Sequence, residues 1–188
     1  MTTPRSAGRP KAISREMLEE AACELFLERG YAHTSVADIT QRAGVSRATF
    51  FNYVASKSDL LWATVDDVLE AVAQELDAAP ATTARVEEAL TRAAAGLTPG
   101  VAVLAMGNAE AMGVREELLA TGAARQARLA GTLREALAGQ GGALWADVRA
   151  RAYAGAFFAA LQEWAVGDPG VEPFSGALAA ALAILRDH

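Results

Sequence analysis

Two short helices joined by a tight turn are predicted within residues 35–57, and this stretch constrains the fold most strongly. Ile39 and Ala43 are four residues apart, so they share one face of the first helix. Phe50 and Tyr53 are three residues apart and share one face of the second helix in the same way. These apolar positions are the ones at which two crossed helices have to face each other.

Polar residues at the helix starts support the same segmentation. Segments 35–38 and 56–59 each begin with serine and end with aspartate, which is the pattern of a capping box. Ser46 stands where the N-cap of the second helix belongs, and Gly44 can adopt the left-handed conformation that ends the first helix. A generic capped pair of helices is the alternative. The pattern favours a helix-turn-helix, whose second helix enters the major groove of DNA.

The composition points to an all-α protein that is long enough to bury a core. The chain has 188 residues, is 52% hydrophobic and contains much alanine. Its apolar runs are about half of the roughly 20 residues that span a bilayer, so we expect no membrane segment. Cys23 is the single cysteine, which excludes an internal disulfide and a cysteine-cluster zinc site. We expect a cytoplasmic protein with no metal and no cofactor.

The charges are distributed unevenly along the chain. Residues 1–62 carry 8 Lys+Arg and 7 Asp+Glu, a balance of +1, whereas the remaining residues carry 9 and 16, a balance of −7, which together give the net charge of −6. Between Ile39 and Ser58 the charged residues are Arg42, Arg47 and Lys57. An acidic body attached to a locally basic segment is typical of a DNA-binding module joined to a domain that does not bind DNA.

Helical periodicity and helix-ending residues predict three regions. Residues 1–12 are expected to form a disordered basic arm, residues 13–62 a three-helix DNA-binding domain, and residues 63–188 a larger helical domain for ligand binding and dimerisation. The first helix is expected to start at Ser14 and to end at Gly30. Further helices are predicted at residues 57–79, 83–97, 114–137, 144–166 and 174–185, and a short apolar segment is expected at residues 101–106.

The last two predicted helices, 144–166 and 174–185, are apolar almost all round. A terminal helix of this kind in a small domain needs a cover, and a second copy of the chain provides one by forming a four-helix bundle. We therefore expect a homodimer, with Leu178 and Leu182 in its interface. A wide packing face within one chain is the alternative.

Residues 14–62 resemble the DNA-binding domain of the TetR family of bacterial transcriptional regulators. The family's run of threonine, large apolar residue, aromatic residue, variable residue, histidine or tyrosine, and apolar residue stands here as residues 49–54, TFFNYV. Lys57 and the pair Asp59-Leu60 follow as they do in the family. Thr40 departs from the family's usual small alanine. The resemblance covers about a quarter of the chain and implies a homodimer that occupies an operator and is released by a small molecule.

The side chains around the second helix can be given roles in binding double-stranded DNA. Arg47 and Asn52 are the candidates for base contacts, because arginine pairs with guanine and asparagine with adenine. Lys57 is expected to meet a phosphate together with the positive end of its helix, and Ser35 to do the same at its own helix start. Four further residues are expected to pack against the DNA backbone or bond its phosphates: Ser46, Thr49, Phe51 and Tyr53. Core packing is the alternative for Phe51 and Tyr53.

Large side chains in a background of alanine and glycine predict a ligand pocket in the larger domain. Such pockets are mainly apolar with a few polar anchors, so we expect a small, largely apolar effector. The candidate lining residues are Trp62, Met106, Asn108, Met112, Gln126, Tyr153, Phe157, Phe158 and Gln162. A solid core built from the same residues is the alternative.

An enzyme is the competing class of function. Hydrolytic or transfer chemistry needs a nucleophile and a base or a cluster of ligands, and the chain has two histidines, His33 and the terminal His188. No catalytic residue is assigned. A DNA-binding regulator or architectural protein without a ligand is a further alternative, and whether a regulator represses or activates is left open.

Overall fold

The computed structural model describes residues 9–77 and 80–186, with side chains from Arg15 onward. Within these ranges the regular secondary structure is entirely α-helical, as predicted. The helices are α1 (Arg9–Arg29), α2 (Val36–Arg42), α3 (Arg47–Phe51), α4 (Lys57–Leu76), α5 (Thr83–Ala94), α6 (Val101–Gly107), α7 (Arg115–Leu137), α8 (Ala143–Val166) and α9 (Phe174–Arg186).

The start of α1 differs from the expectation. The helix begins at Arg9, five residues before Ser14, so residues 9–12 of the expected disordered arm are helical. Pro10 is compatible with this start, because proline in the first helical turn has a suitable φ and needs no amide hydrogen. The rest of the expected arm, residues 1–8, lies outside the described residues.

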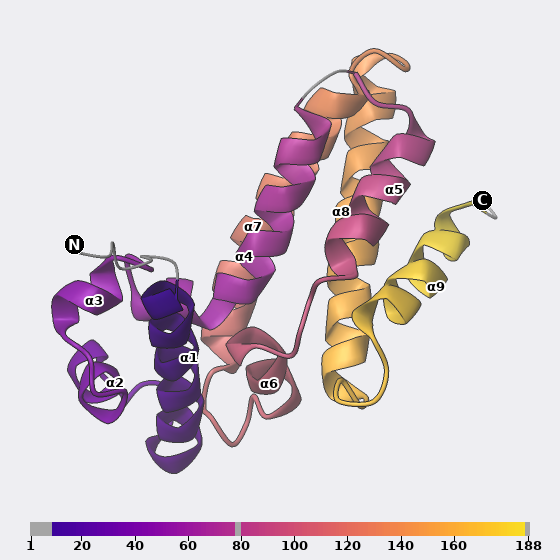
Figure 1. Cartoon of the computed structure of the whole chain (residues 1–188). Coiled ribbons are helices and arrows are strands. Elements are labelled where there is room, and N and C mark those ends of the chain that lie inside the picture. The colour runs from indigo at the N-terminus through magenta and orange to yellow at the C-terminus, as the bar shows by residue number, and fades with distance from the viewer. Residues whose placement is uncertain (1–8, 78–79, 187–188) are drawn as a thin grey trace, which may run out of the picture.

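The helices form two connected parts. In Figure 1, α1, α2 and α3 lie together at one end, and α4 runs from that end alongside α7 into the larger part. The small part has a core of large apolar side chains from all three helices, among them Phe26, Ile39 and Phe50. α4 contacts α1 at one end and α5, α6 and α7 along its length, so it belongs to both parts.

The inner face of α9 packs on α8 within the same chain. Phe174 meets Phe157 edge to face, with the ring centroids 5.2 Å apart, and it also lies 5.4 Å from Trp164. Leu178 and Leu182 are 0% and 2% exposed. The expectation that these two leucines form the dimer interface is therefore wrong, because α8 and α5 already cover them.

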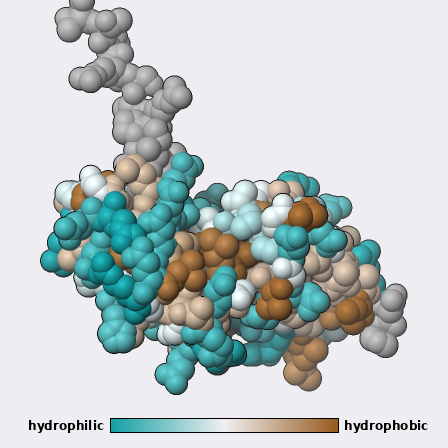
Figure 2. Space-filling model, turned by 90° about the horizontal axis from the view of Figure 1, so that it is seen from below, coloured by the Kyte–Doolittle hydropathy of each residue, from teal (hydrophilic) through white to brown (hydrophobic). Residues whose placement is uncertain are grey.

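A different face of the last two helices remains open. Leu144, Val148, Ala159 and Val166 are exposed, and their spacing keeps them on one side of α8. On α9 the exposed residues include alanines and Ile184. Figure 2 shows a contrast on one face of the molecule: the surface over the end that carries α2 and α3 is mostly hydrophilic, whereas hydrophobic patches lie among hydrophilic ones over the middle and the opposite end.

Candidate nucleic-acid interface

The turn between α2 and α3 has the geometry that the sequence predicts. Gly44 has a φ of 65°, the left-handed region in which glycine is favoured. The Ser46 hydroxyl oxygen accepts a hydrogen bond from the Thr49 amide at 3.0 Å, which caps α3. At the start of α2, the Ser35 hydroxyl accepts from the Asp38 amide while the Asp38 carboxylate accepts from the Ser35 amide at 2.8 Å. Both short helices therefore have fixed starting points.

The two faces of α3 are chemically different. Phe50 is fully buried against the small part's core, whereas Arg47, Asn52 and Phe51 are exposed. Phe51 is 51% exposed and contacts the Phe50 ring edge to face. Its ring is therefore available to solvent and is not a core side chain, which decides against the packing alternative for this residue.

Four more of the predicted DNA-contacting residues lie near this exposed face. Ser46 is exposed and its hydroxyl lies 2.9 Å from that of Thr49, which is half-buried. Tyr53 follows α3 and is half-buried against the core. Ser35 is exposed at the start of α2, where its hydroxyl also donates to the Asp38 carboxylate. The structure thus places all of them at the same end of the molecule.

Thr40 keeps the fold of this part despite the departure from the family pattern. Its side chain is buried, and the hydroxyl donates a hydrogen bond to the Ala37 carbonyl at 3.1 Å. A buried hydroxyl that is bonded within its own helix costs little, so the helix accommodates threonine in place of alanine.

The three cations between residues 39 and 58 have different partners. Arg42 donates to Glu24 and Glu28 of α1 at 2.8 Å each, and these bonds raise the pKa of Arg42. Lys57 is bonded to backbone carbonyls. Arg47 has no hydrogen-bond or ion-pair partner among the described residues. Among these three cations, Arg47 is therefore the one whose guanidinium is free for an external acceptor.

Lys57 is engaged inside the protein, in contrast to the expected phosphate contact. Its Nζ donates to the carbonyls of Tyr31 at 2.6 Å and Thr34 at 2.8 Å, and it lies 3.8 Å from the centre of the Tyr31 ring. Burial lowers the pKa of Lys57, while the nearby Glu117 carboxylate opposes that shift. A phosphate contact by Lys57 remains a prediction, and it would require one of these bonds to be exchanged.

The nine predicted ligand-binding residues fall into two groups. Trp62, Phe157 and Phe158 form one cluster between α4 and α8, in which Trp62 and Phe158 have ring centroids 6.3 Å apart. The Gln126 amide lies beside Gly155 of α8, near this cluster, while the Tyr153 hydroxyl donates to Glu87 of α5 at 3.0 Å. The remaining four, Met106, Asn108, Met112 and Gln162, belong to other surroundings.

The four residues of the second group do not line a common pocket with the aromatic cluster. Asn108 is exposed and donates to the Leu104 carbonyl at 2.8 Å. Met112 is buried, and its carbonyl accepts from the Tyr31 amide at 2.7 Å. Gln162 is exposed on α8, and Met106 is half-buried on α6.

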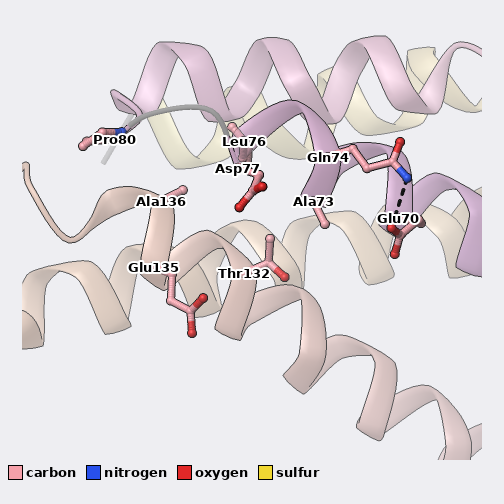
Figure 3. Close-up of a pocket in the computed structure, with 9 residues that line it drawn as sticks. All are labelled: Glu70, Ala73, Gln74, Leu76, Asp77, Pro80, Thr132, Glu135 and Ala136. Atoms are coloured by element: carbon pink, nitrogen blue, oxygen red, sulfur yellow. Dashed lines mark hydrogen bonds between the residues drawn. The ribbon is translucent and has the colours of Figure 1, made fainter.

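Three surface hollows are open to solvent and lie away from the predicted ligand residues. One, of about 480 Å³, lies between α4 and α7 and carries Glu70, Asp77 and Glu135, as Figure 3 shows. A second, of about 670 Å³, lies between α5 and α9, and a third, of about 420 Å³, lies between α1 and α2. None of the nine predicted residues lines these hollows, and the carboxylates of the first suit an apolar effector poorly.

The sequence reasoning missed a charged cluster between α4 and α7. Arg125 of α7 is 9% exposed and donates through Nε and Nη2 to the Asp66 carboxylate of α4, at 2.9 and 2.7 Å. Arg128 contacts the same carboxylate. The Arg125 guanidinium also lies 5.2 Å from the Trp62 ring, whose Nε1 donates to Thr121 at 2.7 Å. Arg125 stands among the apolar positions of α7, and this placement in the sequence could have indicated a buried arginine that needs an acidic partner.

Comparisons with known proteins identify the small part. Residues 18–64 match the family described as bacterial regulatory proteins, TetR family. The candidate mycofactocin biosynthesis regulator MftR of Mycobacterium tuberculosis is 38% identical over 55 residues, 29% of this chain and 28% of that protein. The transcriptional regulator TcmR of Streptomyces glaucescens is 35% identical over 83 residues, 43% of this chain and 37% of that protein. The chain thus spans only about a third of the length of these curated relatives.

The fold of the whole chain also has a counterpart. A crystal structure of a candidate transcriptional regulator from Pseudomonas aeruginosa PAO1 has a TM-score of 0.53 and 23% identity, covering 92% of this chain and 88% of that one. This likeness concerns the fold. No helix in the described residues is long and apolar enough to cross a membrane. The matched relatives are described as transcriptional regulators, and residues 18–64 of this chain are similar to the DNA-binding domain of the TetR family.

Proposed function

We propose that the chain acts in the cytoplasm as a homodimer on a near-palindromic DNA operator and that a small, largely apolar effector releases it. The main support for DNA binding is that the Arg47 side chain is exposed and unpaired in the part of the chain that the structure describes. This residue stands at the start of a capped helix whose opposite face is buried, and it has no partner among the described residues. An exposed guanidinium on a rigid short helix is suited to reading the edge of guanine.

The neighbouring residues supply further contacts in this arrangement. Asn52, exposed at the end of α3, pairs with adenine, and Ser46, Thr49 and Phe51 approach the DNA backbone. Tyr53 and Ser35 complete the same surface. The Tyr53 ring contacts the core, so its contribution to DNA binding comes from the hydroxyl end.

The dimer forms through the open face of α8 and α9. Val148 and Ile184 are 57% and 63% exposed, and neighbouring alanines allow another helix to approach closely. A two-fold axis through this face pairs each helix with its copy, and the two α3 helices then address two half-sites of the operator.

The effector acts at the cluster formed by Trp62, Gln126, Phe157 and Phe158. These residues belong to α4, α7 and α8, and α4 continues directly into the DNA-binding domain. A ligand that separates the rings shifts α4 and changes the distance between the two α3 helices. A tenfold loss of DNA affinity requires about 1.4 kcal/mol of coupling between the two sites. The packed rings equally support the second candidate, a DNA-binding regulator without a ligand.

Two measurements test these proposals. Sedimentation of the protein with duplexes selected from a random pool is expected to show one dimer bound to a sequence with two inverted half-sites. Recovery of sequences without such symmetry contradicts the proposal. Small aromatic and acyl compounds are then tested for release of that duplex, with Phe158→Trp as a variant that fills the cluster. If no compound releases the duplex and the variant behaves as the wild type, the regulator without a ligand is favoured.

A further inference from the structure

The contacts of Lys57 join three separate segments of the chain. Its ammonium donates to the carbonyls of Tyr31 and Thr34, which lie in the turn between α1 and α2. Lys57 itself is the first residue of α4. The Tyr31 amide in turn donates to the carbonyl of Met112, in the loop between α6 and α7, at 2.7 Å. We call this set of contacts, made by Lys57, Tyr31, Thr34 and Met112, the turn clasp.

The turn that Lys57 holds is also the support of the helix-turn-helix. Thr34 is 2% exposed, and its hydroxyl donates to the Gly30 carbonyl at 2.9 Å. The next residue, Ser35, is the N-cap of α2. Any movement of this turn therefore moves the start of α2 and, through the tight turn at Gly44, the position of α3.

The helix dipole provides an independent reason to expect such a role. A cation in the first turn of a helix is disfavoured by the positive end of the dipole, so Lys57 gains nothing from α4 itself. The two carbonyl oxygens and the face of the Tyr31 ring provide the compensating negative potential.

The choice of lysine at this position is informative in this sequence. The chain contains 17 Lys+Arg, of which Lys11 and Lys57 are the lysines and all the others are arginines. A compact ammonium with three rotatable donors can meet two carbonyls and a ring at once, whereas a planar guanidinium cannot adopt the same arrangement. Arginine serves at least as well as lysine for contacting a phosphate.

We propose that Lys57 is a positioning residue that ties the α1–α2 turn to the start of α4 and so sets the orientation of α2 and α3. This inference rests on the proposed DNA-binding function and assigns Lys57 a role other than a phosphate contact. Through Tyr31 and Met112, the turn clasp also attaches the DNA-binding domain to the α6–α7 loop of the larger part.

Lys57→Arg separates the two roles, because it keeps the charge and changes its shape. The turn clasp predicts that operator binding weakens by roughly tenfold, the loss that corresponds to one charge-assisted hydrogen bond. It also predicts faster amide hydrogen exchange in residues 30–36, with an unchanged thermal midpoint for the larger part. A phosphate contact predicts wild-type affinity and exchange. Lys57→Arg with wild-type values in both measurements overturns the proposal.

Lys57→Met covers the case in which arginine prevents folding. Methionine keeps the packing on the Tyr31 ring and removes the ammonium, so the turn clasp again predicts faster exchange in residues 30–36. A phosphate contact predicts unchanged exchange, together with a salt slope that is lower by about one unit; that result overturns the proposal. If the wild-type protein binds no duplex at all, the proposed function fails, whereas the exchange measurement still decides the role of Lys57.

Discussion

The helix-turn-helix part and the α4–α7 contact each contain an arginine, and the two arginines differ in exposure and in pairing. Arg47 on α3 is exposed and has no partner in the described part of the chain, while Arg125 on α7 is buried and donates twice to Asp66. An unpaired surface cation adds nothing to the stability of the free protein, so its presence favours a role in binding. A buried cation with a bonded carboxylate has the reverse meaning, since it fixes two helices against each other.

This contrast implies that substitutions in the two regions should have separable effects. Changes on the exposed face of α3 should alter DNA affinity and leave the free energy of unfolding almost unchanged. Changes at the α4–α7 contact should mainly lower the free energy of unfolding. The open face of α8 and α9, which we propose as the dimer interface, is a third case, because changes there should alter DNA binding through assembly.

The largest expected effect concerns that open face. Val148→Glu combined with Ile184→Glu places charges on the proposed dimer interface, so we expect a monomer in sedimentation experiments. Operator affinity should fall about 100- to 1,000-fold, because two half-sites are no longer bound by linked domains. Ala127→Glu on the exposed side of α7 is the matched control and should remain a dimer. A doubly substituted protein that stays dimeric shows that another face pairs the copies.

The next effect is on stability. Arg125→Met removes the guanidinium and leaves Asp66 with Arg128 as its partner, so the free energy of unfolding should fall by about 2–3 kcal/mol, somewhat less than for a fully buried pair. Arg128 is mostly exposed, and Arg128→Met should cost less than about 1 kcal/mol. Urea unfolding of both variants checks this order. Equal losses of unfolding free energy in the two variants would show that the burial of Arg125 does not determine its contribution to stability.

A smaller effect is expected at the DNA surface. Arg47→Ala should weaken operator binding by about 1–3 kcal/mol and relax base preference at one position of each half-site. Its unfolding free energy should stay within about 0.5 kcal/mol of the wild type, because the side chain is exposed and unpaired. Arg92→Ala removes the same charge from the larger part and serves as the control. Similar losses of affinity in both variants would indicate a general charge effect.

The smallest effect is a pH dependence at the start of α2. The hydrogen bonds from Ser35 hold the pKa of Asp38 below its usual value. A carboxylate with a lowered pKa in the folded state stabilises the protein above its unfolded pKa of about 3.9, and this stabilisation disappears as the pH falls through the folded value. Asp38→Asn should therefore be less stable than the wild type at pH 7, and the difference should shrink as the pH falls below about 3.9. A gap of constant size across this range contradicts the assignment.

The helices and the turn between α2 and α3 could be predicted because their signals are local. Ser46 and Gly44 mark the ends of short helices within a few residues, and α7 begins one residue after its expected start. The exposure of Arg47 follows from the same helical spacing that buries Phe50. Such features depend only on residues that are close together in the sequence, so they can be recognised from one sequence alone.

Contacts between distant segments could not be predicted in the same way. Asp66 and Arg125 are 59 positions apart in the sequence, with α5 and α6 between them, so nothing near either residue indicates the other. The direction of Leu178 and Leu182 depends on which side of a nearly all-apolar helix meets α8. The ammonium of Lys57 points toward carbonyls more than twenty positions earlier, where backbone acceptors leave no trace in the side-chain pattern.

The position of Trp62 between α4 and α7 makes its fluorescence a natural probe of the distance between these helices. A methyl group at Gly122 would lie 3.2 Å from carbons of the indole ring, so α7 touches α4 at this point with little space between them. Trp145 and Trp164 are the other tryptophans, and phenylalanine at both positions would leave Trp62 as the sole indole fluorophore. Because its ring lies under a guanidinium and its nitrogen bonds a threonine of α7, its emission wavelength should follow the separation of the two helices. Displacement of α4 relative to α7 can then be followed in solution with no attached dye.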